Sequence, residues 1–264
     1  MPGLLSCTQC QFVAADVSLS DEELGHLYGE DYFHGNEYRD YVADRRTHDR
    51  HFRARLKTLL RYVNDPRQKE LFEIGCAYGF FLAAARSEFR AVSGIDISQH
   101  ATDYARQELG LPVLTGDFLQ LPNLSADVIC MWDTIEHLRF PAEYIERASE
   151  VLKPGGTIAI TTGDIGSAIA RWRGKKWRQI HPPTHLHYFS RTTLCRLLEK
   201  HHFIIRYVAA EGQYRSVDTM AWIILRIKRN QPVLYNLLKR AGLLDWDLYL
   251  NTFDIMYVIA EKTI

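Results

Sequence analysis

The chain has 264 residues, of which 47% are hydrophobic and 24% are charged, as is ordinary for a globular protein. Basic and acidic residues number 32 each, and this balance argues against a protein dedicated to binding DNA or RNA. The 5 cysteines are scattered, and no apolar run approaches the roughly 20 residues of a membrane-spanning helix, so we expect a cytoplasmic protein without a transmembrane segment.

Residues 1–65 are expected to form an N-terminal segment that includes a helical cover. Residues 1–19 show no regular pattern. Ser20 and Glu23 have the spacing of a capping box, which predicts the start of a helix. A second helix, rich in charge, is predicted to end at Asp65-Pro66 because proline cannot continue a helix.

From residue 66 to residue 264 the pattern is typical of one α/β domain. Strands are predicted at 71–74, 91–97, 112–115, 126–132, 157–162, 203–209 and 252–260, and helices at 79–88, 98–109, 141–152 and 191–201. This alternation predicts a doubly wound parallel sheet with helices on both faces. Residues 211–250 fall outside the alternation, and we expect them to form an inserted helical cap.

The turn after the first of these strands has the pattern of a nucleotide-binding loop. Gly75 and Gly79 there allow a tight turn and a close approach of the backbone to a ligand. Asp96 ends the second strand, where a carboxylate can accept hydrogen bonds from both hydroxyls of a ribose. The sequence therefore predicts a cofactor that carries a nucleoside.

Two residues of this loop argue against a nicotinamide dinucleotide. Ala77 stands where a dinucleotide-binding loop has its second glycine. Glu73, just before the loop, suits a cofactor with a cationic amino-acid end better than one with a diphosphate. A nicotinamide oxidoreductase stays open as the less favoured alternative.

The block from Leu71 to Gly79 resembles the first motif of class I S-adenosylmethionine-dependent methyltransferases. Further blocks resemble later motifs of that family in the same order, namely 94–98, 116–118, 127–133 with 136–138, 151–156 and 185–190. The resemblance spans residues 70–210. It implies a seven-stranded, doubly wound Rossmann-like methyltransferase sheet and S-adenosylmethionine (SAM) as the cofactor.

The resemblance also implies the residues that hold this cofactor. They are Glu73, Gly75, Cys76, Ala77, Gly79, Asp96, Ile97, Asp117, Phe118, Met131 and Trp132, together with Tyr32 from the N-terminal cover. Asp117 is expected to contact the adenine amine. The tyrosines and phenylalanine between residues 28 and 41 form either a cover over the cofactor or a helix-packing face.

Three residues are candidates for the catalytic group. His137 follows the fourth strand, and an imidazole can accept a proton near neutral pH. His185 and Tyr188 lie in the other segment expected to reach the site. The alternatives are a buried helix-capping histidine and simple loop packing. Glu136 and His137 supply only two metal ligands, so we expect no resident metal ion.

Cys7 and Cys10 resemble part of the zinc ribbon that precedes the methyltransferase domain in a bacterial small-molecule subgroup. The other cysteine pair of such a ribbon is absent, so four thiolates cannot come from one chain. We expect an unmetallated remnant. A site completed by histidines or by a partner chain is the alternative.

The substrate is expected to be a small anionic metabolite. Residues 171–178 combine basic and tryptophan side chains, and Arg173, Lys176 and Trp177 are candidates for binding a phosphate or carboxylate and a sugar or ring. A solvated basic loop is the alternative. The chain lacks the Pro-Cys and Asn/Asp-Pro-Pro-Tyr motifs of nucleobase methylases, which argues against a nucleic-acid substrate.

The predicted function is SAM-dependent methylation of an oxygen, nitrogen or carbon atom of such a metabolite. A SAM-binding regulator or scaffold without transferase activity is the alternative. The basic amphipathic residues 211–250 favour a packed cap or a homodimer contact over docking to a membrane surface.

Overall fold

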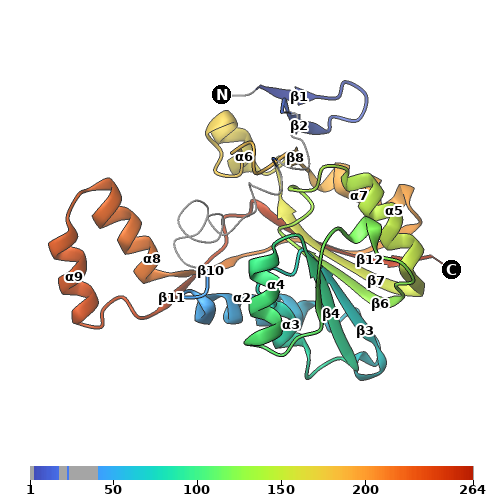
Figure 1. Cartoon of the computed structure of the whole chain (residues 1–264). Coiled ribbons are helices and arrows are strands. Elements are labelled where there is room, and N and C mark those ends of the chain that lie inside the picture. The colour runs from blue at the N-terminus through green and yellow to red at the C-terminus, as the bar shows by residue number, and fades with distance from the viewer. Residues whose placement is uncertain (1–2, 18–22, 24–40, 264) are drawn as a thin grey trace.

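The computed structural model describes residues 3–17, 23 and 41–263. The main body is a seven-stranded sheet with helices on both faces (Figure 1). Across the sheet the strands are β5 (Val113–Thr115), β4 (Ala91–Asp96), β3 (Glu70–Ile74), β6 (Ala126–Trp132), β7 (Leu152–Gly163), β12 (Ile255–Lys262) and β9 (Phe203–Ala210). The predicted doubly wound, seven-stranded fold is confirmed.

One strand departs from the predicted parallel arrangement. The pairings among β5, β4, β3, β6 and β7 are parallel, whereas β12 is antiparallel to both β7 and β9. The chain leaves β9 and enters β12 at the same end of the sheet, so it returns beside β9 in the opposite direction. The expectation of an all-parallel sheet was therefore wrong at the last strand.

Alternating side chains of the central strands separate two cores. Val128 and Cys130 pack toward one face of the sheet, and Ile129 and Met131 pack toward the other. Helices α2 (Arg45–Leu59), α3 (Phe80–Ala85) and α4 (Gln99–Gln107) cover the first face, and α5 (Pro141–Val151) and α7 (Arg191–Lys200) cover the second. Short helices lie at η2 (Pro66–Gln68), η3 (Phe118–Gln120), α6 (Ala168–Arg173) and η4 (Gly174–Lys176).

The N-terminal residues add a small sheet rather than irregular chain. Strands β1 (Leu4–Ser6), β2 (Val13–Ala15) and β8 (His187–Tyr188) pair in that order, all antiparallel. Their two or three residues are too short to show a pattern in the sequence. Cys7 and Cys10 are exposed in the turn between β1 and β2. The helix start predicted at Ser20 lies outside the described residues.

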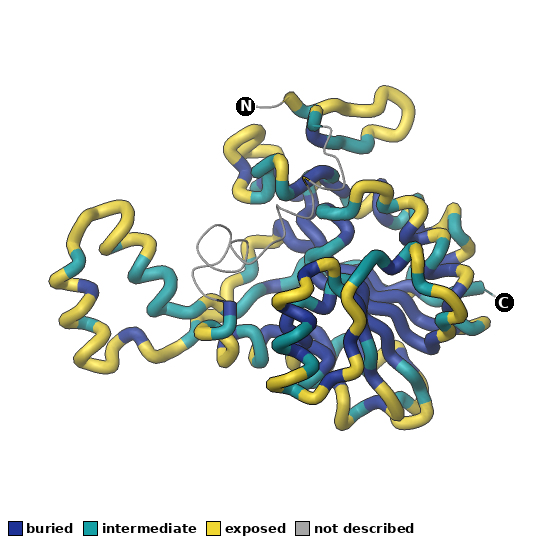
Figure 2. The backbone as a smooth tube through the Cα atoms, viewed as in Figure 1, coloured by how far each residue is buried: buried dark blue, intermediate teal, exposed yellow. Residues whose placement is uncertain are grey.

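Residues 213–250, here called the arm, project from the body and are largely exposed (Figures 1 and 2). They contain β10 (Gln213–Ser216), α8 (Val217–Ala221), the π-helical turn η5 (Trp222–Lys228), α9 (Pro232–Arg240) and β11 (Asp247–Leu250). The base of the arm is tied to α2, where the hydroxyl of Thr47 donates to Asp247 at 2.7 Å. No helix in the described part of the chain has the length and apolar character needed to cross a bilayer.

Candidate active site

A cavity of about 1110 Å³ opens where β3, β4 and β6 end. The loops that follow these strands form its floor, and α2 and the base of the arm form further walls. Ligands of doubly wound sheets bind at this edge, beyond the carboxyl ends of the strands. This volume is somewhat above the range of about 300–1,000 Å³ usual for small-molecule sites, so a cofactor and a second molecule can share the cavity.

The loop after β3 depends on a backbone conformation that favours glycine. Gly75 has φ of 73°, and a Cβ atom there would lie 2.5 Å from Cγ2 of Thr134. Ala77 also has a positive φ of 44°, and its amide donates to Oδ2 of Asp96 at 2.8 Å. The loop is therefore held in shape by the strand that lies beside it.

Asp96 both anchors this loop and lines the cavity. Its Oδ1 accepts a hydrogen bond from the amide of Ser98 at 2.9 Å, opposite the Ala77 bond on Oδ2. Burial raises its pKa, and the amide donors of Ser98 and Ala77 oppose that rise. Each carboxylate oxygen has a second lone pair, so the group can still accept from the hydroxyls of a ribose.

Glu73 presents an unsatisfied carboxylate oxygen at the cavity. Its residue is 2% exposed, and among the described residues its Oε2 has no hydrogen-bond partner. Burial, followed by the nearby Asp96 charge, raises its pKa well above the usual value. A buried polar atom without a partner is costly, and an ammonium group or a water held by one would satisfy it. The residues present therefore fit the amino-acid end of SAM.

The other residues expected to hold the cofactor divide into two groups. Those that line the cavity are Gly75, Cys76, Ala77, Ile97, Phe118 and Trp132. Gly79, Asp117 and Met131 do not line it. Met131 alternates with Trp132 along β6 and points into the opposite core, and Gly79 caps α3. Tyr32 lies outside the described residues.

Asp117 makes local contacts and is not one of the residues that line the cavity. Its Oδ1 accepts from the hydroxyl of Tyr144 at 2.5 Å and from the amide of Leu119 at 2.9 Å. The side chain thus caps η3 and ties it to α5. The expected contact of Asp117 with adenine stays a prediction, while the neighbouring Gly116 and Phe118 line the cavity.

An ion pair that we did not predict closes one wall of the cavity. Arg55 of α2 is 1% exposed, and its Nη2 lies 2.7 Å from Oδ2 of Asp133, which follows β6. Burial would raise the pKa of Asp133, but the charge and hydrogen bond of Arg55 outweigh burial and hold that pKa below its usual value. The available signal was the position of Arg55 in the apolar stripe of α2, beside Phe52 and Leu59.

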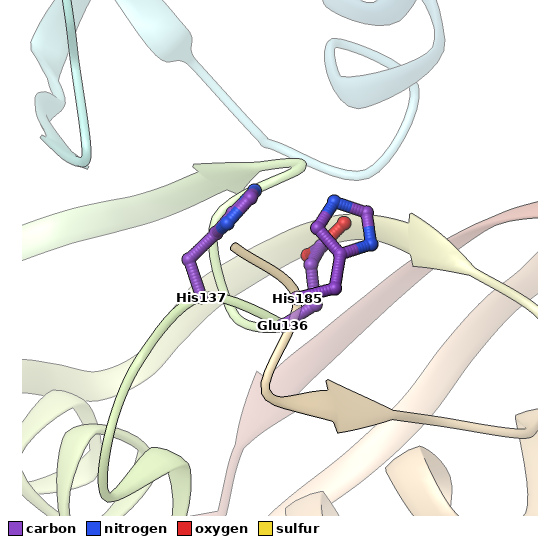
Figure 3. A group of neighbouring side chains, drawn as sticks. All are labelled: Glu136, His137 and His185. Atoms are coloured by element: carbon purple, nitrogen blue, oxygen red, sulfur yellow. The ribbon is translucent and has the colours of Figure 1, made fainter. Parts of the chain in front are cut away.

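Two histidines and a glutamate from separate segments meet in the cavity (Figure 3). Glu136 and His137 come from the loop after β6, and His185 comes from the segment before β8. The rings of His137 and His185 have centroids 4.6 Å apart. Burial lowers their pKa values to about 4 and about 2, so both rings are neutral at pH 7. Burial and the Asp133 charge raise the pKa of Glu136 to about 8.

The structure thus brings His137 and His185 together as expected, but it places Tyr188 elsewhere. The Tyr188 hydroxyl donates to the backbone carbonyl of His185 at 2.9 Å, and its ring packs in the small core under β2. It does not line the cavity. The tyrosine lies on β8 with its side chain on the core side, so its catalytic role is replaced by support of the His185 backbone.

The basic run at residues 171–178 does not form the expected anion site. Arg173 and Lys176 are exposed and lie outside the cavity lining. Trp177 is 2% exposed, and its Nε1 donates to Asp254 at 2.7 Å. Burying this indole turns its basic neighbours toward solvent. Arg178 is the residue of the run that lines the cavity, and it pairs with Asp254 at 3.0 Å.

Comparisons with known proteins agree with this geometry. A family model described as "Methyltransferase domain" matches residues 42–208. The chain is 28% identical over 103 residues to the ubiquinone biosynthesis O-methyltransferase of Azoarcus sp. (strain BH72), covering 36% of this chain and 44% of that protein. It is 25% identical over 200 residues to the mitochondrial enzyme of the same name from Schizosaccharomyces pombe, covering 67% of this chain and 62% of that enzyme.

The chain therefore spans less than two thirds of the length of either relative. Among solved structures, a SAM-dependent methyltransferase from Thermotoga maritima superposes with a TM-score of 0.57 at 19% identity, covering 91% of this chain and 100% of that one. One from Mesorhizobium loti superposes with a TM-score of 0.53 at 19% identity, covering 79% and 98%. These likenesses show the fold.

Proposed function

The chain belongs to the methyltransferase-domain family, whose cofactor is SAM, and from this premise we propose that it transfers a methyl group to a hydroxyl oxygen of a small molecule. The observation that carries the cofactor part of the proposal is the Glu73 carboxyl, which is buried beside Asp96 in one large cavity. Its Oε2 has no hydrogen-bond partner among the described residues. The names of the ubiquinone biosynthesis relatives support oxygen as the acceptor atom.

The chain's own residues would bind and align the two reactants. The cofactor supplies a methyl group on a positively charged sulfur. Glu73 would accept from its ammonium group, and Asp96 would accept from its ribose hydroxyls. The neutral rings of His137 and His185 lie at the same cavity, where an acceptor hydroxyl can be held by a hydrogen bond. Holding the two reactants in line is itself a large part of the rate enhancement of such a transfer.

The lining suggests the chemistry of the acceptor. Helix α8 and the turn η5 of the arm contribute the apolar side chains of Met220, Trp222 and Ile223. A hydroxylated molecule with an apolar or aromatic body suits this wall. If it carries an anionic group, Arg178 replaces Arg173 and Lys176 as the proposed contact, because it lines the cavity.

The assembly and location are also part of the proposal. The arm exposes large apolar side chains, among them Val233 at 80% and Leu237 at 63%, and a second copy of the chain is the proposed partner for this surface. Light scattering after size-exclusion chromatography measures whether the chain forms a dimer. The free, exposed thiols of Cys7 and Cys10 suit a reducing cytoplasm.

Calorimetric titration with SAM and its demethylated product tests the cofactor assignment. We expect Asp96→Ala to weaken binding by about 2–4 kcal/mol, because charge-assisted hydrogen bonds to the ribose are lost. Asp103→Ala, which removes a half-exposed carboxylate on the adjacent α4, is the control and should bind normally. Equal affinity of the wild type and Asp96→Ala would overturn the assignment.

Methyl transfer is tested separately with a panel of phenols and catechols and the corresponding amines. Product formation on oxygen is the expected result. Tight cofactor binding with transfer to none of these acceptors would favour a SAM-binding protein without transferase activity.

A further inference from the structure

The group of Glu136, His137 and His185 has the composition of a metal site. Each residue offers a ligand atom, and these atoms lie within 4.8 Å of one another. Figure 3 shows the three side chains converging from two segments of the chain. The sequence placed only Glu136 and His137 together. The fold adds His185, because the amide of Leu186 donates to the carbonyl of Glu136 at 2.9 Å.

Backbone contacts set the orientation of both imidazole rings. Nδ1 of His137 lies 2.8 Å from the carbonyl oxygen of Thr184, and Nδ1 of His185 lies 2.8 Å from that of Gln179. A carbonyl oxygen only accepts, so each Nδ1 carries the hydrogen and each Nε2 carries the lone pair. This is the arrangement of metal-binding histidines, whose other ring nitrogen donates to a carbonyl or carboxylate.

Glu136 gives an independent indication of a ligand. The residue is 3% exposed, and its Oε2 has no hydrogen-bond partner among the described residues. The carboxylate lines the cavity together with both histidines. A buried carboxyl oxygen without a partner is costly in a folded protein, and a cation that displaces the proton of this group would satisfy it.

We propose that Glu136, His137 and His185 bind one divalent transition-metal ion at the wall of the cavity. Two imidazoles and one carboxylate are the protein ligands in one class of catalytic zinc sites, which keep a further position open. Ligand atoms of a tetrahedral zinc ion lie about 3.3 Å apart, given bonds of about 2.0–2.1 Å. The three ligand atoms, which lie within 4.8 Å of one another, would move closer together by side-chain rotation when the ion binds. This replaces our expectation that the chain has no resident metal ion.

The site would extend the proposed function, on which this step rests. An acceptor hydroxyl that occupies the open position becomes more acidic, as a metal-bound water does. Its O–H bond breaks and the proton passes to water. The oxygen lone pair then forms the bond to the methyl carbon, and the pair of the broken C–S bond returns to sulfur. The ion acts as a Lewis acid and undergoes no redox change.

Metal binding is measured on the full-length protein without any acceptor. After treatment with a chelator, the protein is titrated with Zn²⁺ by calorimetry and with Co²⁺ by visible absorption. We expect one ion per chain and Co²⁺ bands without the charge-transfer absorption of thiolate ligands. A Cys7→Ser/Cys10→Ser variant should bind equally, which separates this site from the exposed cysteines.

Glu136→Gln and His185→Gln should each weaken metal binding by about 10–100-fold or more. Removing a group that only holds a metal ligand in place already causes a loss of this size. His187→Gln is the matched control, because this neighbouring ring stacks on Phe12 outside the cavity. Either ligand variant is sufficient if the other fails to fold.

Calorimetry with SAM on the same variants separates the two proposals, since Glu73 and Asp96 are unchanged in them. Normal cofactor binding together with lost metal binding supports the site. No binding of Zn²⁺ or Co²⁺ by the wild type, or equal binding by the ligand variants, would overturn it and leave the cofactor assignment intact.

Discussion

Glu73 and Asp96 are carboxyl groups at the ends of the neighbouring strands β3 and β4. Their surroundings differ: two amide donors hold Asp96, whereas one oxygen of Glu73 has no partner in the described structure. Donors to a carboxylate stabilise its charge, and burial without donors favours the protonated form. At the scale of single residues, Asp96 is therefore held in place by the chain's own amides, whereas we propose that an ammonium group, or a water held by one, satisfies Glu73.

Cofactor binding is accordingly expected to release a proton from Glu73. The pKa of this group is raised in the free protein and falls when an ammonium group is beside it, so affinity should increase with pH below the raised pKa. Glu73→Gln should remove this release and cost about 1.5–3 kcal/mol of binding. Calorimetric titration with SAM in buffers of different ionisation enthalpy measures the number of protons released on cofactor binding.

Glu70→Gln is the control for this measurement, because Glu70 lies on the same strand but pairs with Arg90 at the surface. The control should keep the proton release of the wild type. An unchanged proton count in Glu73→Gln would show that the proton comes from another group.

At the scale of elements, α2 is the part of the N-terminal region that completes the cavity. It packs Phe52, Leu56 and Leu59 on the sheet, and it carries Arg55 to Asp133. The same helix binds the base of the arm through Thr47 and Asp247. A single helix thus connects the sheet, the cavity wall and the arm, and its placement decides the shape of the site.

Arg55→Met should lower the free energy of unfolding by about 2–4 kcal/mol. Removing one partner of a buried pair leaves an unpaired charge, and the 34% exposure of the Asp133 side chain moderates the cost. Arg55→Met combined with Asp133→Asn should recover part of the loss. Urea denaturation of the single and double variants gives the coupling energy.

Arg53→Met provides the matched control, since Arg53 is exposed on the same helix. Its unfolding free energy should stay close to that of the wild type. Equal costs for Arg53→Met and Arg55→Met would contradict a specific contribution of the buried pair.

At the scale of the whole molecule, several buried imidazoles make the fold sensitive to acid. Burial lowers the pKa of His48 to about 4 and that of His51 well below its usual value. An unfolded chain takes up protons near pH 6.5, whereas the folded chain excludes them from these rings until lower pH. The unfolded state thus binds more protons in this window, so stability is present above pH 6.5 and is lost as the pH falls toward 4.

His48→Phe should reduce this acid sensitivity. The ring of His48 stacks on Tyr41 at 4.0 Å and lies 6.0 Å from Phe80, so phenylalanine can keep the packing without the titration. The loss of unfolding free energy between pH 7 and pH 5 should shrink by about 1–2 kcal/mol. The exposed His100→Phe should leave the pH profile unchanged, and equal profiles for both variants would contradict the prediction.

Local patterns in the sequence determined the fold class and led to the prediction of where the cofactor binds. The strands and helices between residues 70 and 210 show alternation and capping within a few residues, and Gly75 is required by its own positive φ. That Asp96 lies beside the loop after β3 could be predicted from the sequence, because the ends of neighbouring parallel strands lie at one edge of the sheet. These predictions need only residues that are near one another in the sequence or on neighbouring strands.

The rest was decided by contacts between distant parts of the chain. Arg55 looked like one charge among many until α2 placed it against Asp133. His185 became a neighbour of Glu136 only through the pairing of two loops, whereas Trp177 turned inward and left Arg173 in solvent. The type of a residue determines which chemistry its side chain can perform. Its contacts and its burial are determined only when the whole chain packs, because the burial of apolar surface in distant segments decides how each loop is oriented.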